Sequence, residues 1–260
     1  NAVNKKNGVL TQKDFDRYRV IERKPVCGIF QKHRVCSMGE PSSGALTMLQ
    51  ILKLINHNPT WHNYIEASKL AFADRNYYMA DSDFVKTPGE RLLDDNYILK
   101  RRRLISNENI INNAQHGTPD NWKENAQASY HGPNESGTTH ISIIDQYGNA
   151  ISMTSTIENA FGSRIMANGY LLNNELTDFS FSPKKNSNLV ANRVQAGKRP
   201  RSSMTPTIIF STSTNKPTLI IGSAGGSRII GYVTQRIIDV LYNNMSLEDA
   251  INAPHILNRG

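Results

Sequence analysis

The chain has 260 residues, 38% of them hydrophobic, with 17 glycines and 11 prolines, which is enough for one large domain or two small ones with a buried core. The formal net charge of +8 comes from 30 Lys and Arg against 22 Asp and Glu, but the basic residues are not interleaved with aromatic residues and form no recognisable nucleic-acid-binding module, so a nucleic-acid partner is set aside. No run is long and apolar enough to span a membrane, and the first residues have neither an initiator Met nor the apolar core of a secretory signal, so we expect the chain to be part of a longer protein.

The densest basic cluster and the two cysteines are not predicted to form a binding site. Lys100–Arg103 is flanked by apolar residues and is predicted to be the solvated end of a helix, where cations are favoured. Cys27 and Cys36 are too few for a disulfide scaffold and lack the spacing of metal ligands. They are either core residues or a single bridge, and neither a metal nor an organic cofactor is expected.

The first half of the chain is predicted to be mainly helical. A short strand pair is expected around Arg19–Val26 and Arg34–Met38. Apolar residues recur at near-helical spacing in Ala45–Ile55, and a second helix is predicted over Trp61–Met79. Ser106–Gly137 is rich in Asn, Gln, Gly and Pro, has little apolar periodicity, and is predicted to be an exposed loop.

From Thr138 onward the apolar pattern is that of β-strands followed by helices. The predicted elements are a hairpin of His140–Asp145 and Ala150–Ile157, strands at Gly169–Leu172, Thr205–Phe210 and Thr218–Ile221, and helices at Arg228–Tyr242 and Leu247–Asn252. Strands in the middle of the chain with helices on either side predict a layered α+β domain and not a repeat or a solenoid.

The junction between the loop and the first strand of the hairpin is the strongest candidate for chemistry. The chain contains no G-x-S-x-G, H-E-x-x-H or phosphate-loop signature. Instead, Asn134–Gly137 is followed directly by Thr138 and a strand. An ordinary loop before a strand explains this pattern. If the bond between Gly137 and Thr138 is cut, however, Thr138 gains a free α-amine that can act as general base for its own hydroxyl.

Three other segments could bind charged groups. Gly222–Arg228 is a glycine-rich bend between a strand and a helix, whose backbone N–H groups can point at an oxyanion. The paired hydroxyls of Ser202 and Ser203 could bind a carboxylate, and the acidic residues of Asn173–Ser180 could hold an ammonium group. Each segment taken alone also fits an ordinary surface loop or turn.

Taken together and in this order, these segments resemble the γ-glutamyltranspeptidase family. The matching stretches are Thr138–Asp145, Gly148-Asn149, Thr154–Ile157, Phe161–Ser163, Leu171–Asn174, Asp178–Ser180, Lys198–Pro200, Ser202–Met204, Pro206-Thr207, Gly222-Ser223 and Gly225–Ile229. Upstream, Pro41–Gly44 and Ala71–Arg75 are similar to motifs of the family's large subunit. The resemblance runs along nearly the whole chain.

The resemblance implies a catalytic role for four residues. Thr138 would be both the autoprocessing residue and the nucleophile, and the hydroxyl of Thr156 would orient it. Gly225 and Gly226 would supply the oxyanion hole.

The resemblance also implies how a glutamyl group is bound. Ser202 and Ser203 would bind its α-carboxylate, and Glu175 and Asp178 would bind its α-ammonium, which suits the acidic chemistry of their segment. Glu158 stands where many members have an Asn that contacts the amino group, so it keeps an acceptor but adds a negative charge.

The fold implied by the resemblance is a four-layer αββα sandwich of the N-terminal-nucleophile hydrolase type. Residues 1–137, the C-terminal part of a large-subunit region, and 138–260, the small-subunit region, would form one structural domain. We expect the sandwich to be incomplete, because the family's carboxylate-binding arginine lies in a region upstream of this chain and the chain is expected to lack family residues that follow the Asn252–His255 motif. Between Ser180 and Lys198 the family often has a longer lid with a Tyr, so a more open site is expected.

The function implied is cleavage of γ-glutamyl amides such as glutathione through a γ-glutamyl-Thr138 acyl-enzyme, after autoproteolysis between Gly137 and Thr138. Water, an amino acid or a peptide would be the acceptor, and large and small subunits would come from one precursor. Two alternatives stay open: a cephalosporin or glutaryl acylase with the same nucleophile, which Glu158 and the shorter lid allow, and a non-catalytic remnant of the family. Localisation rests on the resemblance alone, since relatives are commonly periplasmic or secreted.

Overall fold

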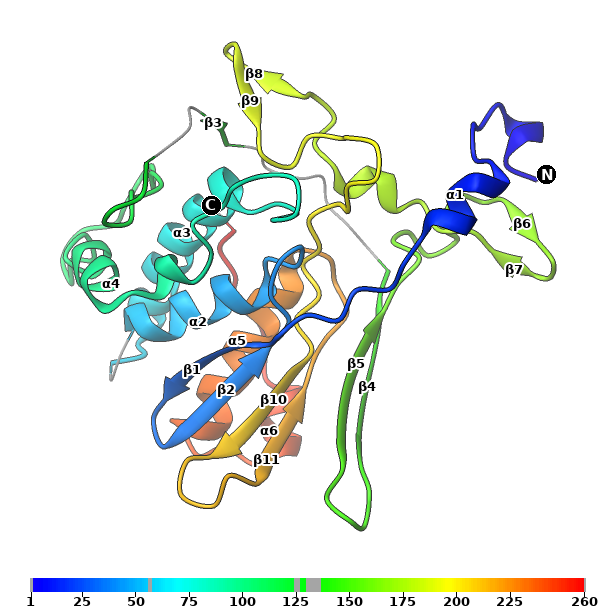
Figure 1. Ribbon diagram of the computed structural model, residues 1–260. Helices are drawn as coiled ribbons and strands as arrows, with labels where there is room; N and C mark the ends of the chain where they lie inside the picture. The colour runs from blue at the N-terminus through cyan, green and yellow to red at the C-terminus, as the bar shows by residue number, and fades with distance from the viewer. Residues whose placement is uncertain (1, 56–57, 124–126, 130–136, 260) are drawn as a thin grey trace.

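The computed structural model describes residues 2–55, 58–123, 127–129 and 137–259 (Figure 1). The α-helices are α1 (Gln12–Arg17), α2 (Gly44–Ile55), α3 (Trp61–Tyr78), α4 (Asp95–Arg102), α5 (Arg228–Leu241) and α6 (Leu247–Asn252). The strands are β1 (Val26–Phe30), β2 (His33–Ser37), β3 (Gln127–Ala128), β4 (Thr139–Ile144), β5 (Ala150–Ser155), β6 (Met166–Ala167), β7 (Tyr170–Leu171), β8 (Lys184–Lys185), β9 (Asn188–Val190), β10 (Thr207–Ser211) and β11 (Pro217–Ile221). Short 3₁₀ helices are η1 (Asn4–Lys6), η2 (Gly89–Leu93) and η3 (Glu175–Asp178).

The main sheet has four antiparallel strands in the order β1-β2-β10-β11 (Figure 1). Strands β1 and β2 precede residue 138, whereas β10 and β11 follow it, so both halves of the chain build the same sheet. Helix α2 contacts β1, β2, α3 and α5, and apolar side chains of these helices form one buried cluster with Val35 and Ile209 of the sheet. The arrangement is an α+β fold, as the sequence predicts.

The two helices at the centre of this cluster are deeply buried. Every residue of α2 except Lys53 is buried. Helix α3 begins after Thr60, whose side chain caps the helix by accepting a hydrogen bond from the backbone N–H of Asn63 at 3.2 Å. Both helices lie within one residue of their predicted bounds.

Polar residues inside the helical layer are paired across helices. Asp74 of α3 is fully buried, and its carboxylate accepts hydrogen bonds from the Tyr97 hydroxyl at 2.7 Å and the backbone N–H of Gly117 at 2.8 Å. The same carboxylate makes an ion pair with Arg101 of α4 at 3.1 Å. The prediction that all of Lys100–Arg103 is solvated is therefore wrong for Arg101, which is 4% exposed because it lies on the inner side of α4 against Asp74.

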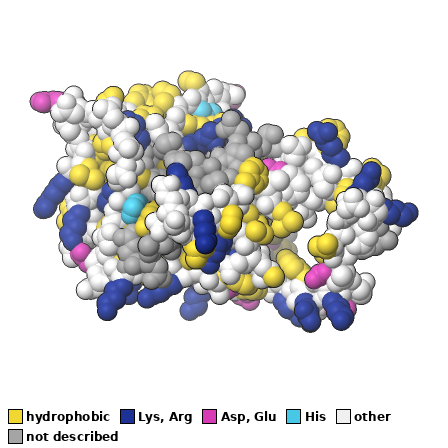
Figure 2. All heavy atoms as spheres, turned by 90° about the horizontal axis from the view of Figure 1, so that it is seen from above, with side chains coloured by type: hydrophobic (Ala, Val, Ile, Leu, Met, Phe, Trp, Pro, Cys, Tyr) yellow, Lys and Arg dark blue, Asp and Glu magenta, His cyan; other side chains and the backbone are white. Residues whose placement is uncertain are grey.

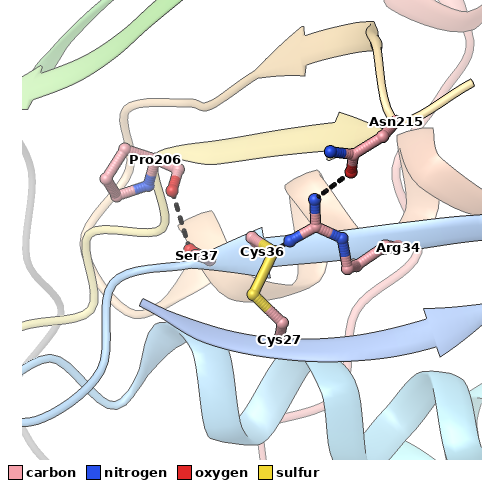
Figure 3. The surroundings of a disulfide bond; sticks show 6 residues. All are labelled: Cys27, Arg34, Cys36, Ser37, Pro206 and Asn215. Atoms are coloured by element: carbon pink, nitrogen blue, oxygen red, sulfur yellow. Dashed lines mark hydrogen bonds between the residues drawn. A yellow bond between two sulfur atoms is a disulfide. The ribbon is translucent and has the colours of Figure 1, made fainter. Parts of the chain in front are cut away.

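Cys27 and Cys36 form a disulfide between the paired strands β1 and β2 (Figure 3). The two residues face each other in register, with their Cα atoms 4.1 Å apart. On β2, Ser37 donates a hydrogen bond to the backbone oxygen of Pro206 at 2.8 Å, and Arg34 donates one to the Asn215 side chain at 2.6 Å. Of the two possibilities that the sequence leaves open, the single bridge is the observed one.

Strands β4 and β5 form an antiparallel hairpin that lies beside β11 (Figure 1). The side chains of Ser142 and Ser152 donate hydrogen bonds to backbone oxygens of β11, each at 3.3 Å. Large apolar side chains on the hairpin are exposed: Ile141, Ile143, Ile144, Ile151 and Met153. The hairpin therefore keeps much of its apolar surface open to solvent.

The strand predicted at Arg19–Val26 is wrong in its position. Strand β1 begins at Val26, and residues 19–25 are neither helix nor strand. Those residues are mostly charged, whereas Val26 and Phe30 of the observed strand are buried. The other strands and helices lie within two residues of their predicted bounds.

The predicted loop Ser106–Gly137 lies partly outside the described residues. Its described part from 106 to 123 contains neither helix nor strand, as predicted. At Gln127–Ala128 the loop prediction is wrong, because these residues form the short strand β3, which pairs in parallel with β9. On the face drawn in Figure 2, Lys and Arg side chains are spread around the surface and are not gathered into one patch.

Within the described ranges, no helix is long and apolar enough to cross a membrane. Among the same residues, no group of three or more His, Cys, Asp and Glu side chains could hold a metal ion.

Candidate active site

One small pocket collects residues that lie far apart in the sequence. Its lining residues are Gly137, Thr138, Thr156, Glu158, Glu175, Asp178, Ser202, Ser203, Met204, Gly226 and Ile229. The pocket includes every residue predicted for the site except Gly225, which precedes the lining residue Gly226. The fold thus brings together in space the four segments that the sequence analysis related only through their joint resemblance to a family.

The hairpin β4–β5 places two threonines side by side. In its register Thr139 is paired with Ser155, so Thr138 and Thr156 are the next residues outward on the two strands. The Thr138 hydroxyl donates a hydrogen bond to the backbone oxygen of Gly137, and the Thr156 hydroxyl donates to the same oxygen at 3.1 Å. The two hydroxyl oxygens are 3.4 Å apart.

The Thr156 hydroxyl is itself fixed by the backbone. Its oxygen accepts a hydrogen bond from the N–H of Glu158 at 2.8 Å, which leaves its proton for the carbonyl of Gly137. A hydroxyl that donates to a carbonyl oxygen withdraws charge from the carbonyl carbon and stabilises an oxyanion there. The arrangement can therefore assist attack of the Thr138 hydroxyl on the Gly137 carbonyl.

Only glycine fits at position 137. Its φ angle is +125°, and a Cβ there would lie 2.2 Å from the backbone oxygen of Glu158. L-residues with side chains rarely adopt this backbone conformation, and the contact would force the chain to move. The junction residues Asn134–Ser136 lie outside the described part of the chain.

Glu158 is held in a strained backbone conformation next to the threonines. Its φ angle is +72°, which is uncommon for a residue with a side chain and is often found at functional sites. Its carboxylate accepts a hydrogen bond from the side-chain amide of Asn174, which also donates to the Thr177 hydroxyl at 3.2 Å. Asn174 therefore fixes the Glu158 carboxylate at the pocket.

Glu175 and Asp178 add two more carboxylates to the pocket. Both belong to η3, and the backbone oxygen of Asp178 accepts a hydrogen bond from the side chain of Asn192 at 2.7 Å. Asn192 also accepts from the backbone N–H of Arg201 at 2.9 Å, so the segment before residue 180 is tied to the one that carries the serines. With Glu158, these side chains favour a cationic group in the pocket.

Ser202 and Ser203 bring two hydroxyl groups to the same pocket. Their backbone is braced by the Pro41–Gly44 turn: the N–H of Ser202 donates to the oxygen of Pro41 at 3.1 Å, and the N–H of Ser43 donates to the oxygen of Ser202 at 2.9 Å. Hydroxyl groups can donate to a carboxylate, whereas the acidic side chains cannot when ionised. The pocket therefore combines groups suited to both charged ends of an α-amino acid.

The glycine-rich bend between β11 and α5 lies against the segment that carries Thr138. Gly225 and Gly226 have φ angles of +126° and +58°. Their carbonyl oxygens accept hydrogen bonds from the N–H groups of Arg228 and Ile229, whereas within the described ranges their own N–H groups donate to no acceptor. Two such N–H groups next to a nucleophile are the donors that an oxyanion hole needs.

His140 packs directly on the start of this bend, a contact that sequence reasoning did not find. A Cβ on Gly222 would lie 2.2 Å from the imidazole ring. The ring nitrogens contact the hydroxyls of Thr154 at 2.8 Å and Ser142 at 3.0 Å, and burial lowers the pKa of His140 below its ordinary value. The imidazole thus connects β4 with the glycine-rich bend.

Sequence reasoning also missed apolar lining residues and a buried lysine. Met204 and Ile229 line the pocket, and both belong to quoted motifs in which only their neighbours had been assigned a role. Lys198 is buried and donates hydrogen bonds to the backbone oxygens of Ala191 at 2.6 Å and Arg193 at 3.0 Å. Burial lowers its pKa to about 8. These hydrogen bonds hold the end of the stretch before Arg199 against residues 191–193.

Comparison with known proteins identifies the family. A family model described as Gamma-glutamyltranspeptidase matches residues 1–260. The chain belongs to this family, which is of the N-terminal-nucleophile hydrolase type.

Individual relatives carry two kinds of names. The chain is 37% identical to a glutathione hydrolase proenzyme of Bacillus subtilis over 96% of its own length and 44% of that protein. It is 29% identical to an acylase ACY 1 proenzyme of a Pseudomonas species over 97% of its length and 44% of that protein. The chain thus spans less than half the length of the curated relatives that it matches.

A solved structure supports the fold alone. The cephalosporin acylase of Bacillus halodurans superposes with a TM-score of 0.81 over 97% of this chain and 44% of its own chain, at 24% sequence identity.

Proposed function

We propose that the complete protein to which this chain belongs is a γ-glutamyl hydrolase or transferase that first cleaves itself between Gly137 and Thr138. The observation that carries the proposal is the convergence of the Thr138 and Thr156 hydroxyls on the carbonyl oxygen of Gly137, in a pocket lined by acids and serines. Family membership supports the same reaction class.

The proposed self-cleavage uses only this chain and water. The Thr138 oxygen attacks the Gly137 carbonyl carbon, with its proton passing to the Thr138 nitrogen as the C–N bond breaks, which leaves an ester between Gly137 and the Thr138 side chain. Thr156 stabilises the charge that develops on the carbonyl oxygen. Water then hydrolyses the ester, releasing a carboxylate at Gly137 and a free α-amine at Thr138.

The same hydroxyl then acts on substrate. The free α-amine takes the Thr138 proton as the oxygen attacks the amide of a γ-glutamyl compound, and the proton passes to the leaving amine. Gly225 and Gly226 bind the oxyanion through their N–H groups. Water or the amine of an amino acid or peptide then releases the γ-glutamyl group from Thr138.

Charge in the pocket supports a γ-glutamyl group as the acyl part of the substrate. Glu158, Glu175 and Asp178 suit its α-ammonium, and Ser202 and Ser203 suit its α-carboxylate. The pocket encloses about 20 Å³, which is room for about one water molecule. After cleavage, movement of the new chain end at Gly137 out of the pocket would therefore also make room for substrate.

The division of the chain follows from the same proposal. Residues 1–137 would end the large subunit and 138–260 would begin the small one, and the shared sheet would hold them together as one domain. The exposed apolar side chains of β4 and β5 fit a strand hairpin that is covered in the complete protein, as a four-layer αββα sandwich requires.

An acylase acting on cephalosporins or glutaryl amides is the second candidate. Glu158 adds a third carboxylate to the pocket, and a named acylase proenzyme is among the relatives. A glutaryl group lacks the α-ammonium, so the acidic lining favours the γ-glutamyl compound over a glutaryl amide.

The test is intact mass of the complete protein and its Thr138→Ala and Thr138→Ser variants after incubation at neutral pH. Wild type and the Ser variant are expected to give two fragments that meet at Gly137 and Thr138, whereas the Ala variant stays whole. An uncleaved wild type would overturn the proposal in favour of a non-catalytic member of the family. Release of glutamate from glutathione, compared with hydrolysis of a glutaryl amide, then separates the two substrate classes.

A further inference from the structure

Arg75 lies directly behind the pocket. It belongs to α3 and to the Ala71–Arg75 motif, for which sequence reasoning gave no role, and it is only 4% exposed. Its Nη2 donates a hydrogen bond to the Ser203 hydroxyl at 2.6 Å, and its Nε donates to the Ser43 hydroxyl at 2.8 Å. Arg75 does not line the pocket itself, so any effect on a ligand passes through Ser203.

The contact with Arg75 determines where the Ser203 proton can go. A guanidinium has only donors, so the Ser203 oxygen must accept and its own O–H must find another acceptor. The Ser202 oxygen likewise accepts, from the backbone N–H of Met204 at 3.0 Å. Within the described residues neither serine proton has an acceptor. Both O–H groups are therefore available to a ligand in the pocket that they line.

Ser43 keeps the guanidinium in place. Its hydroxyl accepts from Arg75 and donates to the backbone oxygen of Ser202 at 2.9 Å, so the chain of hydrogen bonds returns to the serine pair. Ser43 and Ser203 are both buried. A planar guanidinium can donate along two directions at fixed angles, which a lysine ammonium on a flexible stem does not reproduce.

We propose that Arg75 is a positioning residue that orients the Ser203 O–H into the pocket and makes the site selective for acyl groups with an anionic α-carboxylate. The inference rests on the proposed function, since it assigns to the serine pair the carboxylate of a γ-glutamyl group. The Ser203 O–H and the permanent charge of Arg75 behind it both favour a carboxylate over a neutral carboxamide. Arg75 and Ser43 come from the large-subunit region and the serine pair comes from the small one. After cleavage at residue 137, their hydrogen bonds would therefore connect the two subunits.

The test compares two substrates of the complete, processed protein: γ-glutamyl p-nitroanilide and its analogue with a carboxamide in place of the α-carboxylate. Arg75→Met is expected to raise KM for the carboxylate substrate about 10- to 100-fold, the range of a lost hydrogen bond to a charged group. It should leave kcat within about threefold and change KM for the carboxamide little. Arg75→Lys should restore part of the preference. Equal losses on both substrates would show a structural role only and overturn the proposal.

Two controls keep the outcome decisive. Arg236→Met removes another buried arginine, one that donates to the backbone oxygen of Ala253 at 3.0 Å, and it should not change the ratio between the two substrates. In a Ser203→Ala background, Arg75→Met should add little further loss, because the two residues act on the same group. Additive losses would contradict the proposed path through Ser203.

Failure of the proposed function is recognised separately. If the wild-type protein releases p-nitroaniline from neither substrate, the hydrolase proposal fails. In that case, the proposed role of Arg75 is tested by measuring the binding of L-glutamate and of its α-amide to the same variants by calorimetry. A wild-type preference for glutamate that Arg75→Met removes supports it, and equal or undetectable binding of both compounds overturns it.

Discussion

The helical layer and the hairpin β4–β5 differ in what holds them in place. Every residue of α2 except Lys53 is buried, and its partner α3 is buried along most of its length. On β4, by contrast, no residue is buried, and polar side chains attach the hairpin to β11. Stability is therefore concentrated in the helical layer, while Thr138 lies at the open end of a hairpin held by few contacts.

Two consecutive residues of α3 serve the core and the pocket separately. Asp74 points to α4 and the Gly117 segment, and Arg75 reaches Ser203 at the pocket. Helix α3 thus has a residue that stabilises the core, Asp74, directly before a residue that contacts Ser203 of the pocket, Arg75. Substitutions in the two regions should therefore separate stability from activity.

The largest effect on stability is expected from Asp74→Asn. The amide keeps the shape of the side chain but leaves Arg101 buried without its carboxylate, and the loss of one partner of a buried ion pair costs about 3–5 kcal/mol. Urea denaturation of the complete protein measures the change. The control is Asp120→Asn, which removes the partner of the neighbouring Lys100 at the surface and should cost less than about 1 kcal/mol. Equal losses for the two variants would contradict this view of the helical layer.

The next effect should appear in activity alone. Thr156→Val removes the hydroxyl that donates to the Gly137 oxygen and should slow self-cleavage about 100-fold or more, as for a lost oxyanion donor. The free energy of unfolding should fall by less than about 1 kcal/mol, because Thr156 is only partly buried. The rate is measured as loss of intact precursor by mass spectrometry.

Thr156→Ser is the matched control for this change. It keeps the hydroxyl and should retain most of the cleavage rate. If valine is processed as fast as serine, the Thr156 hydroxyl has no part in cleavage.

The sequence predicts the fold well where apolar spacing is regular. Helices α2, α3 and α5 follow from such spacing, and the hairpin follows from its alternation and central turn. The strand predicted at Arg19–Val26 was wrong because residues 19–25 are mostly charged and exposed, whereas the solvated Arg101 was wrong for a different reason. Charged residues carry no sign of whether a distant partner, such as Asp74, will bury them.

The site could be predicted only as far as its motifs. Their joint resemblance to a family pointed to Thr138, Thr156 and the serine pair, which the fold gathers into one pocket. The roles of Arg75 and His140 depend on contacts between segments more than 60 residues apart, Arg75 with Ser203 and His140 with Gly222. Spacing in the sequence contains no information on such contacts.

The smallest effect concerns Glu40, which directly precedes the Pro41–Gly44 turn that braces the serines. Burial raises the pKa of Glu40 to about 7. A hydrogen bond from Thr87 at 2.7 Å lowers the pKa, and the negative charge of the nearby Asp81 raises it. Because the folded state holds this proton more tightly, stability is lost as pH rises from about 4.5 to 7 and stays lower above that window.

Glu40→Gln removes the charge and keeps the shape, so it should stabilise the protein by up to about 3 kcal/mol at pH 8 and leave it almost unchanged near pH 4.5. Urea denaturation at both pH values measures the difference, and Glu90→Gln, an exposed glutamate on η2, is the control and should show no such dependence. A gain that is equal at the two pH values would mean that Gln improves packing and that the Glu40 charge is not the cause. A gain confined to high pH would show that the ionised Glu40 destabilises the folded protein. Because Glu40 directly precedes the turn that braces the serine pair, its charge would then lower stability next to the pocket.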